Sequence, residues 1–261
     1  MLIVYKRTMP AATLARFVVL EAWRGGLPWL AAGSIVLAGA LAAFLSQVAL
    51  TESRELELAL AAATLRACAV FLVAVQVASS TLRELNDKGL ELMLSLPLGR
   101  STHYLGRLAG FVACGALLAV AFCAPLALWA APGALALWSA SLAFECAVVA
   151  AATLFFSISL GQLVPAIAAS AGFYLLARSM AAIQAIAGGP LADASFASQA
   201  ARGLASAFAL LLPRLDGVTR TEWLLYGVPG YGAAAAAIGA LALYAALLGA
   251  AGLFDFHRKS L

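Results

Sequence analysis

Six long apolar stretches follow one another along this chain of 261 residues, separated by glycine, proline or charged residues. They cover residues 27–50, 58–82, 105–129, 134–160, 163–185 and 227–253. A helix of about 20 apolar residues crosses the hydrocarbon core of a bilayer, so each stretch is long enough to span a membrane. Composition agrees, because 64% of the residues are hydrophobic and only 11% are charged, too few to cover a water-exposed globule. The sequence therefore predicts an all-α, polytopic membrane protein with six transmembrane helices.

Basic residues near the ends of these stretches predict which side of the membrane each end of the chain faces. With both termini in the cytoplasm, ten lysines and arginines lie on the cytoplasmic side and four on the outer side. The cytoplasmic set is Lys6, Arg7, Arg16, Arg24, Arg83, Lys88, Arg100, Arg107, Arg258 and Lys259, and the outer set is Arg54, Arg202, Arg214 and Arg220. Cytoplasmic loops are enriched in Lys and Arg, so this asymmetry predicts that both termini are cytoplasmic.

The chain is predicted to form one membrane domain preceded by a short N-terminal region. Residues 1–26 contain a helix predicted over Thr8–Arg24, which the glycine pair Gly25 and Gly26 ends. Residues 27–261 then form a single six-span transmembrane domain.

The longest polar segment, RELNDKGLELMLSLPLGRST at residues 83–102, lies between the second and third apolar stretches. Gly89 permits a sharp change of direction, and Pro97 ends a short run in which Leu90, Met93 and Leu94 share one helical face. The pattern predicts a short amphipathic helix at the cytoplasmic surface. Its apolar face packs either on the protein's own membrane helices and lipid headgroups or in a groove of a separate cytoplasmic subunit.

The residues in and after this segment form an ordered series: Glu84, Gly89, Glu91, Leu94, Ser95, Leu96, Pro97, Arg100, Gly106 and Arg107. This series resembles the loop between the second and third spans of type 2 ATP-binding cassette (ABC) exporter permeases. The likeness is local, but the layout of six spans with a cytoplasmic N-terminus is also similar to that family.

The resemblance implies a homodimeric permease in the cytoplasmic (inner) membrane of a bacterium, bound to two separate ATPase subunits. In that family the 83–102 segment would be the coupling helix, which implies a coupling role for the matching residues Glu84, Gly89, Glu91, Pro97 and Arg100. ATP and Mg²⁺ would bind to the partner subunits, and this chain would carry no cofactor. In the alternative interpretation, Gly89 and Pro97 only shape a turn and the charged residues only face water.

Two further segments match elements of the same family. The N-terminal helix resembles the elbow helix that lies along the inner membrane interface. Between the fifth and sixth stretches, about residues 186–226, Phe196, Leu204 and Phe208 recur at helical spacing, and this resembles the external gate helices of the family. An ordinary surface helix is the alternative for this second segment.

Three ionisable residues fall inside the apolar stretches: Arg66, Glu145 and Arg178. An unpaired charge at such depth costs at least about 2.5 kcal/mol, so Glu145 is expected to pair with an arginine or to face water. We predict a contact between Arg66 and Glu145 and a place for Arg178 along the translocation path. Alternatively, both arginines extend to the outer headgroups.

Small residues four apart allow two helices to approach closely. Such pairs occur at Ala168 and Gly172 in the fifth stretch and at Gly232 and Ala236 in the sixth, and either they allow close helix contacts or they arise by chance in a chain this rich in alanine.

No pattern for catalysis is present in the sequence. The phosphate-binding motif G-x-x-x-x-G-K-[ST] does not occur, the aspartates fall outside the spans, and His103 and His257 are expected to be isolated at the inner surface. We therefore expect a chain that is not an enzyme and that binds no metal.

The sequence favours an exporter permease, but two other functions stay open. An ion-coupled secondary transporter would need a membrane carboxylate, for which Glu145 is available, and inverted repeats, which are not evident. A non-transporting anchor subunit would use the 83–102 segment only to dock a partner.

Overall fold

The computed structural model describes residues 11–48, 53–86, 99–187, 196–227 and 230–258. Within them the chain forms helices and no strands. The helices are α1 (Ala11–Arg24), α2 (Leu27–Val48), α3 (Ser53–Asn86), α5 (Arg100–Leu126), α6 (Pro132–Leu160), α7 (Leu163–Ala187), α8 (Phe196–Leu211), the 3₁₀ turn η1 (Leu215–Gly217), α9 (Glu222–Tyr226) and α10 (Tyr231–Arg258).

Six of these helices, α2, α3, α5, α6, α7 and α10, are long and apolar enough to cross a membrane. The prediction of an all-α, multi-pass membrane protein is confirmed. The second span is longer than its apolar stretch, because α3 continues through the charged residues at both of its ends to reach Ser53 and Asn86.

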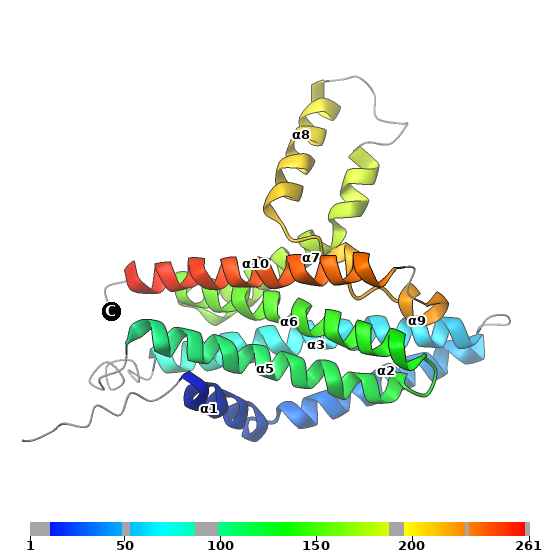
Figure 1. Ribbon diagram of the computed structural model, residues 1–261, viewed down its shortest axis with the longest axis horizontal. Helices are drawn as coiled ribbons and strands as arrows, with labels where there is room; N and C mark the ends of the chain where they lie inside the picture. Colours follow the sequence, from blue (N-terminus) through cyan, green and yellow to red (C-terminus); the bar gives the residue numbers. More distant parts are fainter. Residues whose placement is uncertain (1–10, 49–52, 87–98, 188–195, 228–229, 259–261) are drawn as a thin grey trace, which may run out of the picture.

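Helix α6 forms the centre of a bundle whose helices run along the long axis of the molecule (Figure 1). It packs against α3, α5, α7 and α10, and more of it is buried than of any other spanning helix in the described chain. Trp138, Leu142 and Val148 are completely buried along it. Every residue from Cys146 to Leu154 is buried, which explains why this part of α6 is almost entirely apolar around its circumference.

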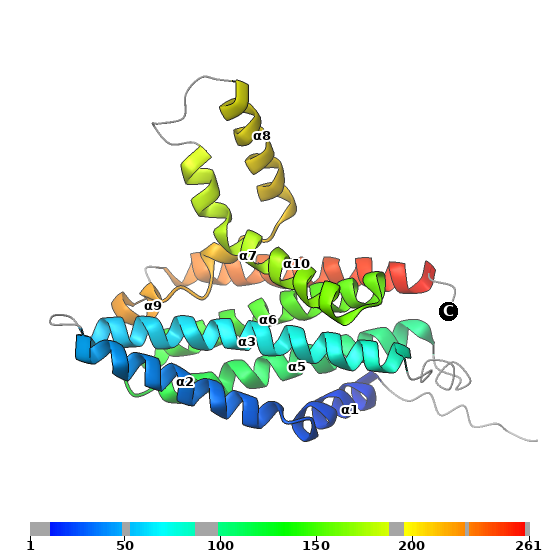
Figure 2. The same ribbon diagram turned by 180° about the vertical axis from the view of Figure 1, so that it is seen from behind.

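The two ends of the bundle carry different elements, and we name them the α1 end and the α9 end. At the α1 end lie α1, the end of α3, the start of α5 and the end of α10, while α9, the end of α2 and the start of α3 lie at the opposite end (Figures 1 and 2). Both ends of the described chain thus lie at one end of the bundle, as an even number of crossings requires. Which end faces the cytoplasm stays a prediction.

Helix α1 confirms the predicted N-terminal helix over Ala11–Arg24, and Thr8 lies outside the described residues. The chain turns at Gly25 and Gly26, whose φ of +92° is a conformation that glycine adopts readily, and enters α2 at an angle to α1 (Figure 2). Leu14, Val18 and Ala22 form the buried face of α1.

Two glycines of α5 let α1 approach closely. A Cβ atom added to Gly106 would lie 2.8 Å from the Cβ of Leu14, and one added to Gly110 would lie 2.6 Å from the Cβ of Val18. Gly172 and Gly232 make no close helix contact within this chain, since a Cβ added at either position meets nothing within 4 Å. These two glycines face away from the bundle, so they do not help its helices to pack closely.

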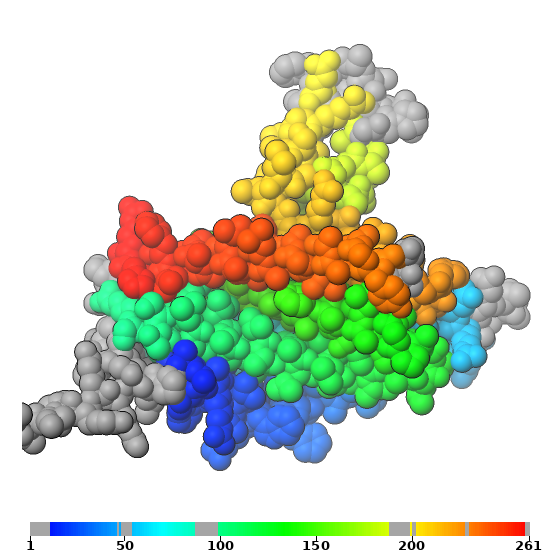
Figure 3. All heavy atoms as spheres, viewed as in Figure 1, coloured from blue at the N-terminus to red at the C-terminus, as the bar shows by residue number. Residues whose placement is uncertain are grey.

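The end of α7 and helix α8 form a hairpin that stands out from the side of the bundle (Figures 1 and 3). The expected helix in the 186–226 segment is therefore confirmed as α8, which ends at Leu211 shortly before Pro213. Large apolar side chains on this hairpin are exposed, among them Leu210 at 91% and Ile186 at 79%.

Candidate functional site

Two groups of polar side chains join the helices inside the bundle. The Glu145 cluster consists of Arg66, Glu145, Tyr174, Arg178 and Thr219. The Glu84 cluster consists of Glu21, Ser80, Arg83, Glu84, His103 and Arg107 and lies at the α1 end.

Glu145 is completely buried on α6, and the protein surrounds its carboxylate with partners. The hydroxyl of Tyr174 on α7 donates a hydrogen bond to Oε1 at 2.8 Å, and the hydroxyl of Thr219 donates to Oε2 at 2.5 Å. Nη1 of Arg178, also on α7, lies 3.6 Å from Oε1. A buried carboxylate needs both charge and hydrogen-bond partners, and Glu145 has both.

The arginines of this cluster bind the backbone of the loop that precedes α9. Nη1 of Arg178 donates to the carbonyl oxygens of Leu215 at 2.5 Å and Val218 at 2.9 Å. Arg66 on α3 donates to the carbonyl oxygen of Thr219 at 3.0 Å. Thr219 is fully buried with a φ of +51°, a left-handed conformation that is uncommon for a β-branched residue. The surrounding contacts hold it there.

The prediction that Glu145 pairs with an arginine is confirmed, but the predicted partner is wrong. Among the residues described, Glu145 forms its ion pair with Arg178 and none with Arg66. Arg66 and Glu145 instead bind different atoms of the same residue, Thr219. Both arginines point at loop carbonyls, so the alternative in which they extend to the headgroups is also wrong. Whether Arg178 lies along a translocation path stays a prediction.

The cluster joins α3, α6 and α7 to the segment 215–219, which contains the 3₁₀ turn η1, and holds that segment in place. In a low-dielectric interior such charge-assisted hydrogen bonds are strong, and leaving one partner alone is costly. The cluster contains one carboxylate, and the described part of the chain holds no group of three potential metal ligands.

We expect Arg178→Lys to loosen this loop while leaving the bundle folded. A lysine keeps the charge that faces Glu145, but it lacks the planar guanidinium that reaches several oxygens at once. Backbone amide hydrogens of residues 216–219 should exchange with deuterium about tenfold faster than in the wild type, since losing about one net hydrogen bond changes an opening equilibrium by that factor. Exchange in α6 should stay unchanged, and equal protection of the loop in both proteins would contradict this role.

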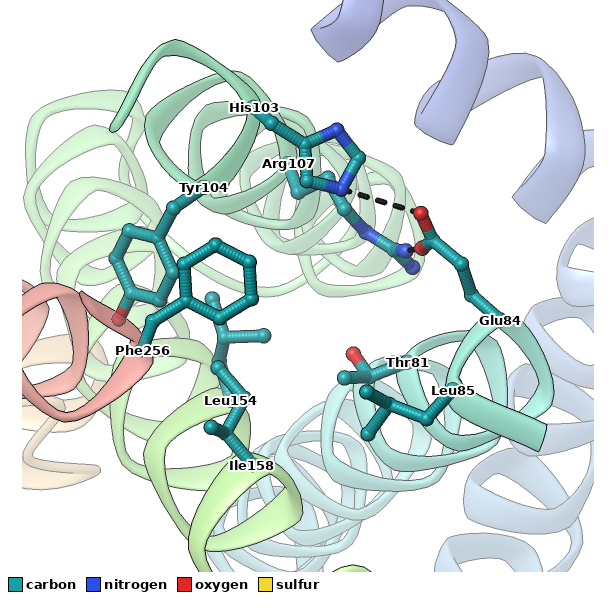
Figure 4. A pocket seen from close by; sticks show the side chains of 9 residues that line it. All are labelled: Thr81, Glu84, Leu85, His103, Tyr104, Arg107, Leu154, Ile158 and Phe256. Atoms are coloured by element: carbon teal, nitrogen blue, oxygen red, sulfur yellow. Dashed lines mark ion pairs between the residues drawn. The ribbon is translucent and has the colours of Figure 1, made fainter. Parts of the chain in front are cut away.

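In the Glu84 cluster, a carboxylate from α3 meets two basic side chains from α5 (Figure 4). Glu84 forms an ion pair with Arg107, and Nε2 of His103 lies 3.1 Å from its Oε1. The side chains of Glu84 and His103 are only 16% and 13% exposed. The expectation of an isolated His103 is therefore wrong, because α3 brings Glu84 to it.

A second set of contacts connects this cluster to α1. Glu21 forms an ion pair with Arg83 and accepts a hydrogen bond from the hydroxyl of Ser80 at 3.1 Å. The same Ser80 oxygen accepts a hydrogen bond from Nη2 of Arg107 at 2.8 Å. Ser80 is thus the bridge through which α1, α3 and α5 share one polar network.

The predicted coupling residues divide into two groups. Glu84 lies in the cluster, pointing between α3 and α5, and Arg100 is the first residue of α5, where it is half-buried. Gly89, Glu91 and Pro97 lie outside the described residues, as does the predicted amphipathic helix.

The predicted gate residues lie on α8. Leu204 and Phe208 are 61% and 45% exposed. Phe196 is the first residue of the helix, and its side chain lies outside the described part of the chain.

No protein-family model matches this chain, and no curated protein matches its sequence. The function is therefore inferred mainly from the Glu84 cluster and from the residue series 84–107.

Several residues of the clusters and of the α1–α5 contact were not predicted in these roles. Gly106 and Gly110 have the four-residue spacing of a close helix contact, so this signal was present in the sequence. Glu21 could have been identified as a charge on an otherwise apolar helical segment. Tyr174 and Thr219 carry no comparable signal, because their roles depend on the fold that brings them to Glu145.

Proposed function

We propose that this chain is the membrane-spanning permease subunit of an ATP-driven exporter. Two copies would form the translocation path, and two separate ATPase subunits would dock on the 83–102 segment. The chain would lie in the inner membrane of a bacterium with both termini in the cytoplasm.

The contacts that Glu84 makes between α3 and α5 are the main support for this proposal. Helix α3 ends at Asn86 and α5 begins at Arg100, so the two helices enter and leave the segment that resembles the coupling helix. Glu84, which lies within that segment on the last turn of α3, connects the two helices through Arg107 and His103. A displacement of the segment would therefore be transmitted to both helices together. Glu84 would serve as a positioning residue, since its buried carboxylate is not available to touch a partner.

Two other observations support the proposal. The hairpin of α7 and α8 exposes Leu204, Phe208 and Leu210, and an apolar surface that stands out from a bundle is suited to contact with a second copy. The sequence also lacks a phosphate-binding loop, so ATP hydrolysis would require a separate subunit.

Purification of the tagged chain from its native membrane tests the proposal. We expect an ATPase subunit to be retained and the complex to hydrolyse ATP. Glu91→Gln and Glu84→Gln, both in the 83–102 segment, should each reduce ATP turnover about fivefold or more, the lower range of coupling between two sites. Glu222→Gln is the matched control, because Glu222 is exposed at the α9 end.

The other outcomes identify the competing functions. A chain that is purified alone and moves solute in response to an ion gradient would be a secondary transporter. A chain that retains a partner without ATPase activity would be an anchor subunit. Each result contradicts the exporter proposal.

A further inference from the structure

A small cavity lies beside the Glu84 cluster, between α3, α5, α6 and α10 (Figure 4). Most of its lining from α3 and α5 is polar, whereas α6 and α10 contribute the apolar side chains of Leu154, Ile158 and Phe256. The space open to the centre of a water molecule is about 20 Å³. About 10–15 Å³ is enough for one water molecule, so the cavity has room for water and for nothing much larger.

Buried polar atoms without a partner gather around this cavity. In the described part of the chain, seven buried side-chain nitrogen and oxygen atoms have no hydrogen-bond partner in the protein. Five of the seven belong to residues that line the cavity: Oγ1 of Thr81, Oε1 of Glu84, Nδ1 of His103, the hydroxyl of Tyr104 and Nε of Arg107. Buried polar groups are nearly always hydrogen-bonded, either to protein or to ordered water. Their concentration at one place therefore indicates a bound ligand.

Three of these atoms are suited to bind one ligand together. Thr81 is only 5% exposed, and its hydroxyl points toward the side of the cavity that holds Glu84 and Arg107 (Figure 4). Oε1 of Glu84 lies 3.1 Å from Nε2 of His103, but this contact is not aligned as a hydrogen bond, so Oε1 can still accept one. Nε of Arg107 can only donate, and the hydroxyl of Thr81 can do both. A ligand that both accepts and donates matches this set.

The charges around the cavity favour a neutral ligand. The carboxylate of Glu84 is paired with the guanidinium of Arg107, so one negative and one positive charge cancel. Of the other lining groups, only His103 and Tyr104 can titrate, and both are uncharged in their ordinary neutral forms. With His103 neutral, no net charge is available to replace the hydration shell of an ion.

We propose that the cavity binds one ordered water molecule. The water accepts a hydrogen bond from Nε of Arg107, donates one to Oε1 of Glu84 and forms a third with the hydroxyl of Thr81. It thus joins α3 to α5 beside their direct ion pair, and a bridge of this kind is nearly as favourable as a direct hydrogen bond. The proposal depends on the packing at the α1 end and not on the exporter function.

Thr81→Val tests the water through the sign of its effect on stability. Valine has nearly the shape of threonine but no hydroxyl, so the variant removes one hydrogen bond to the water. We expect the melting temperature of the full-length protein in detergent to fall by about 2–4 °C, the shift for one net hydrogen bond in a chain of this size. A melting temperature equal to or above that of the wild type would overturn the proposal, because it would place the hydroxyl in a dry void.

Thr153→Val is the matched control. Thr153 on α6 is also buried with an unpartnered hydroxyl, but it does not line the cavity. Removing a hydroxyl that has no partner should leave the melting temperature unchanged or raise it. Equal falls in the two variants would overturn the proposal, since they would report a general cost of valine at a buried threonine.

Hydroxyl-radical labelling of the wild type is a second measurement that needs no variant to fold. Brief X-ray irradiation generates radicals from bound as well as bulk water, so a buried side chain beside ordered water is labelled. Tyr104, only 2% exposed, should be labelled at a dose that leaves Phe122 unlabelled, because Phe122 is buried on the same helix and does not line the cavity. Thr81→Ser, which keeps a hydroxyl, should retain this labelling, and Thr81→Val should lose it. Equal labelling of Tyr104 and Phe122 in the wild type would overturn the proposal.

Discussion

Replacement of Gly110 with leucine should separate α1 from α5 and strongly destabilise the protein. Even a Cβ atom at this position would lie 2.6 Å from the Cβ of Val18 and 2.9 Å from the carbonyl oxygen of Ala15. Backbone atoms of α1 cannot move aside without moving the whole helix. Overpacking of a close contact costs about 1–3 kcal/mol, and we expect the upper part of that range here. Thermal unfolding of the detergent-solubilised protein measures the effect.

The matched control for this variant is Gly239→Leu on α10, where an added Cβ meets nothing within 4 Å. It should leave the melting temperature unchanged or raise it, since glycine is a poor helix former. A reciprocal exchange, Gly110→Ala with Val18→Gly, should recover part of the stability that Gly110→Ala alone loses. Equal melting temperatures for Gly110→Leu and the wild type would contradict the close packing of α1 on α5.

Glu145→Ala should produce the second large effect, a loss of about 3–5 kcal/mol, because it leaves the guanidinium of Arg178 without its carboxylate in a buried site. Tyr174 and Thr219 would also lose their hydrogen-bond acceptor. The yield of monodisperse protein and its melting temperature measure this loss.

A double-mutant cycle separates the ion pair from general damage to the core. Glu145→Ala combined with Arg178→Ala should cost less than the sum of the single variants, by about 0.5–3 kcal/mol, as expected for residues in contact. The control is Arg214→Ala, which removes an exposed arginine near the same loop. Strict additivity would mean that the two charges do not stabilise each other.

The spans could be predicted because the bilayer imposes a length and a polarity on each helix, independent of its neighbours. The expectation that Glu145 binds an arginine has the same origin, the cost of an unpaired charge in an apolar interior. The choice of Arg178 over Arg66 has a different cause. It depends on how α3 and α7 are rotated and on where the 215–219 loop enters the bundle, and no local pattern in the chain contains that information.

The Glu84 cluster, too, could be predicted from the sequence only in part. The polarity of residues 83–102 indicated a special role for this segment, and Glu84 was selected on that basis. Its inward orientation follows from α3 continuing as a regular helix to Asn86, which turns Glu84 toward His103 and Arg107 on α5. The contact with Glu21 through Ser80 requires α1 to lie against α5, which in turn requires Gly106 and Gly110.

The tight turn between α6 and α7, made by Gly161 with a φ of +66°, has a consequence for how the protein enters the bilayer. It joins the helix that carries Glu145 to the helix that carries Arg178, so the two charges belong to a single helical hairpin. Inserted one at a time, each helix would bring an isolated charge into hydrocarbon. Inserted as a hairpin, they bring opposite charges that neutralise each other. The free-energy cost of membrane insertion for this region is therefore lowest when both helices enter the bilayer together.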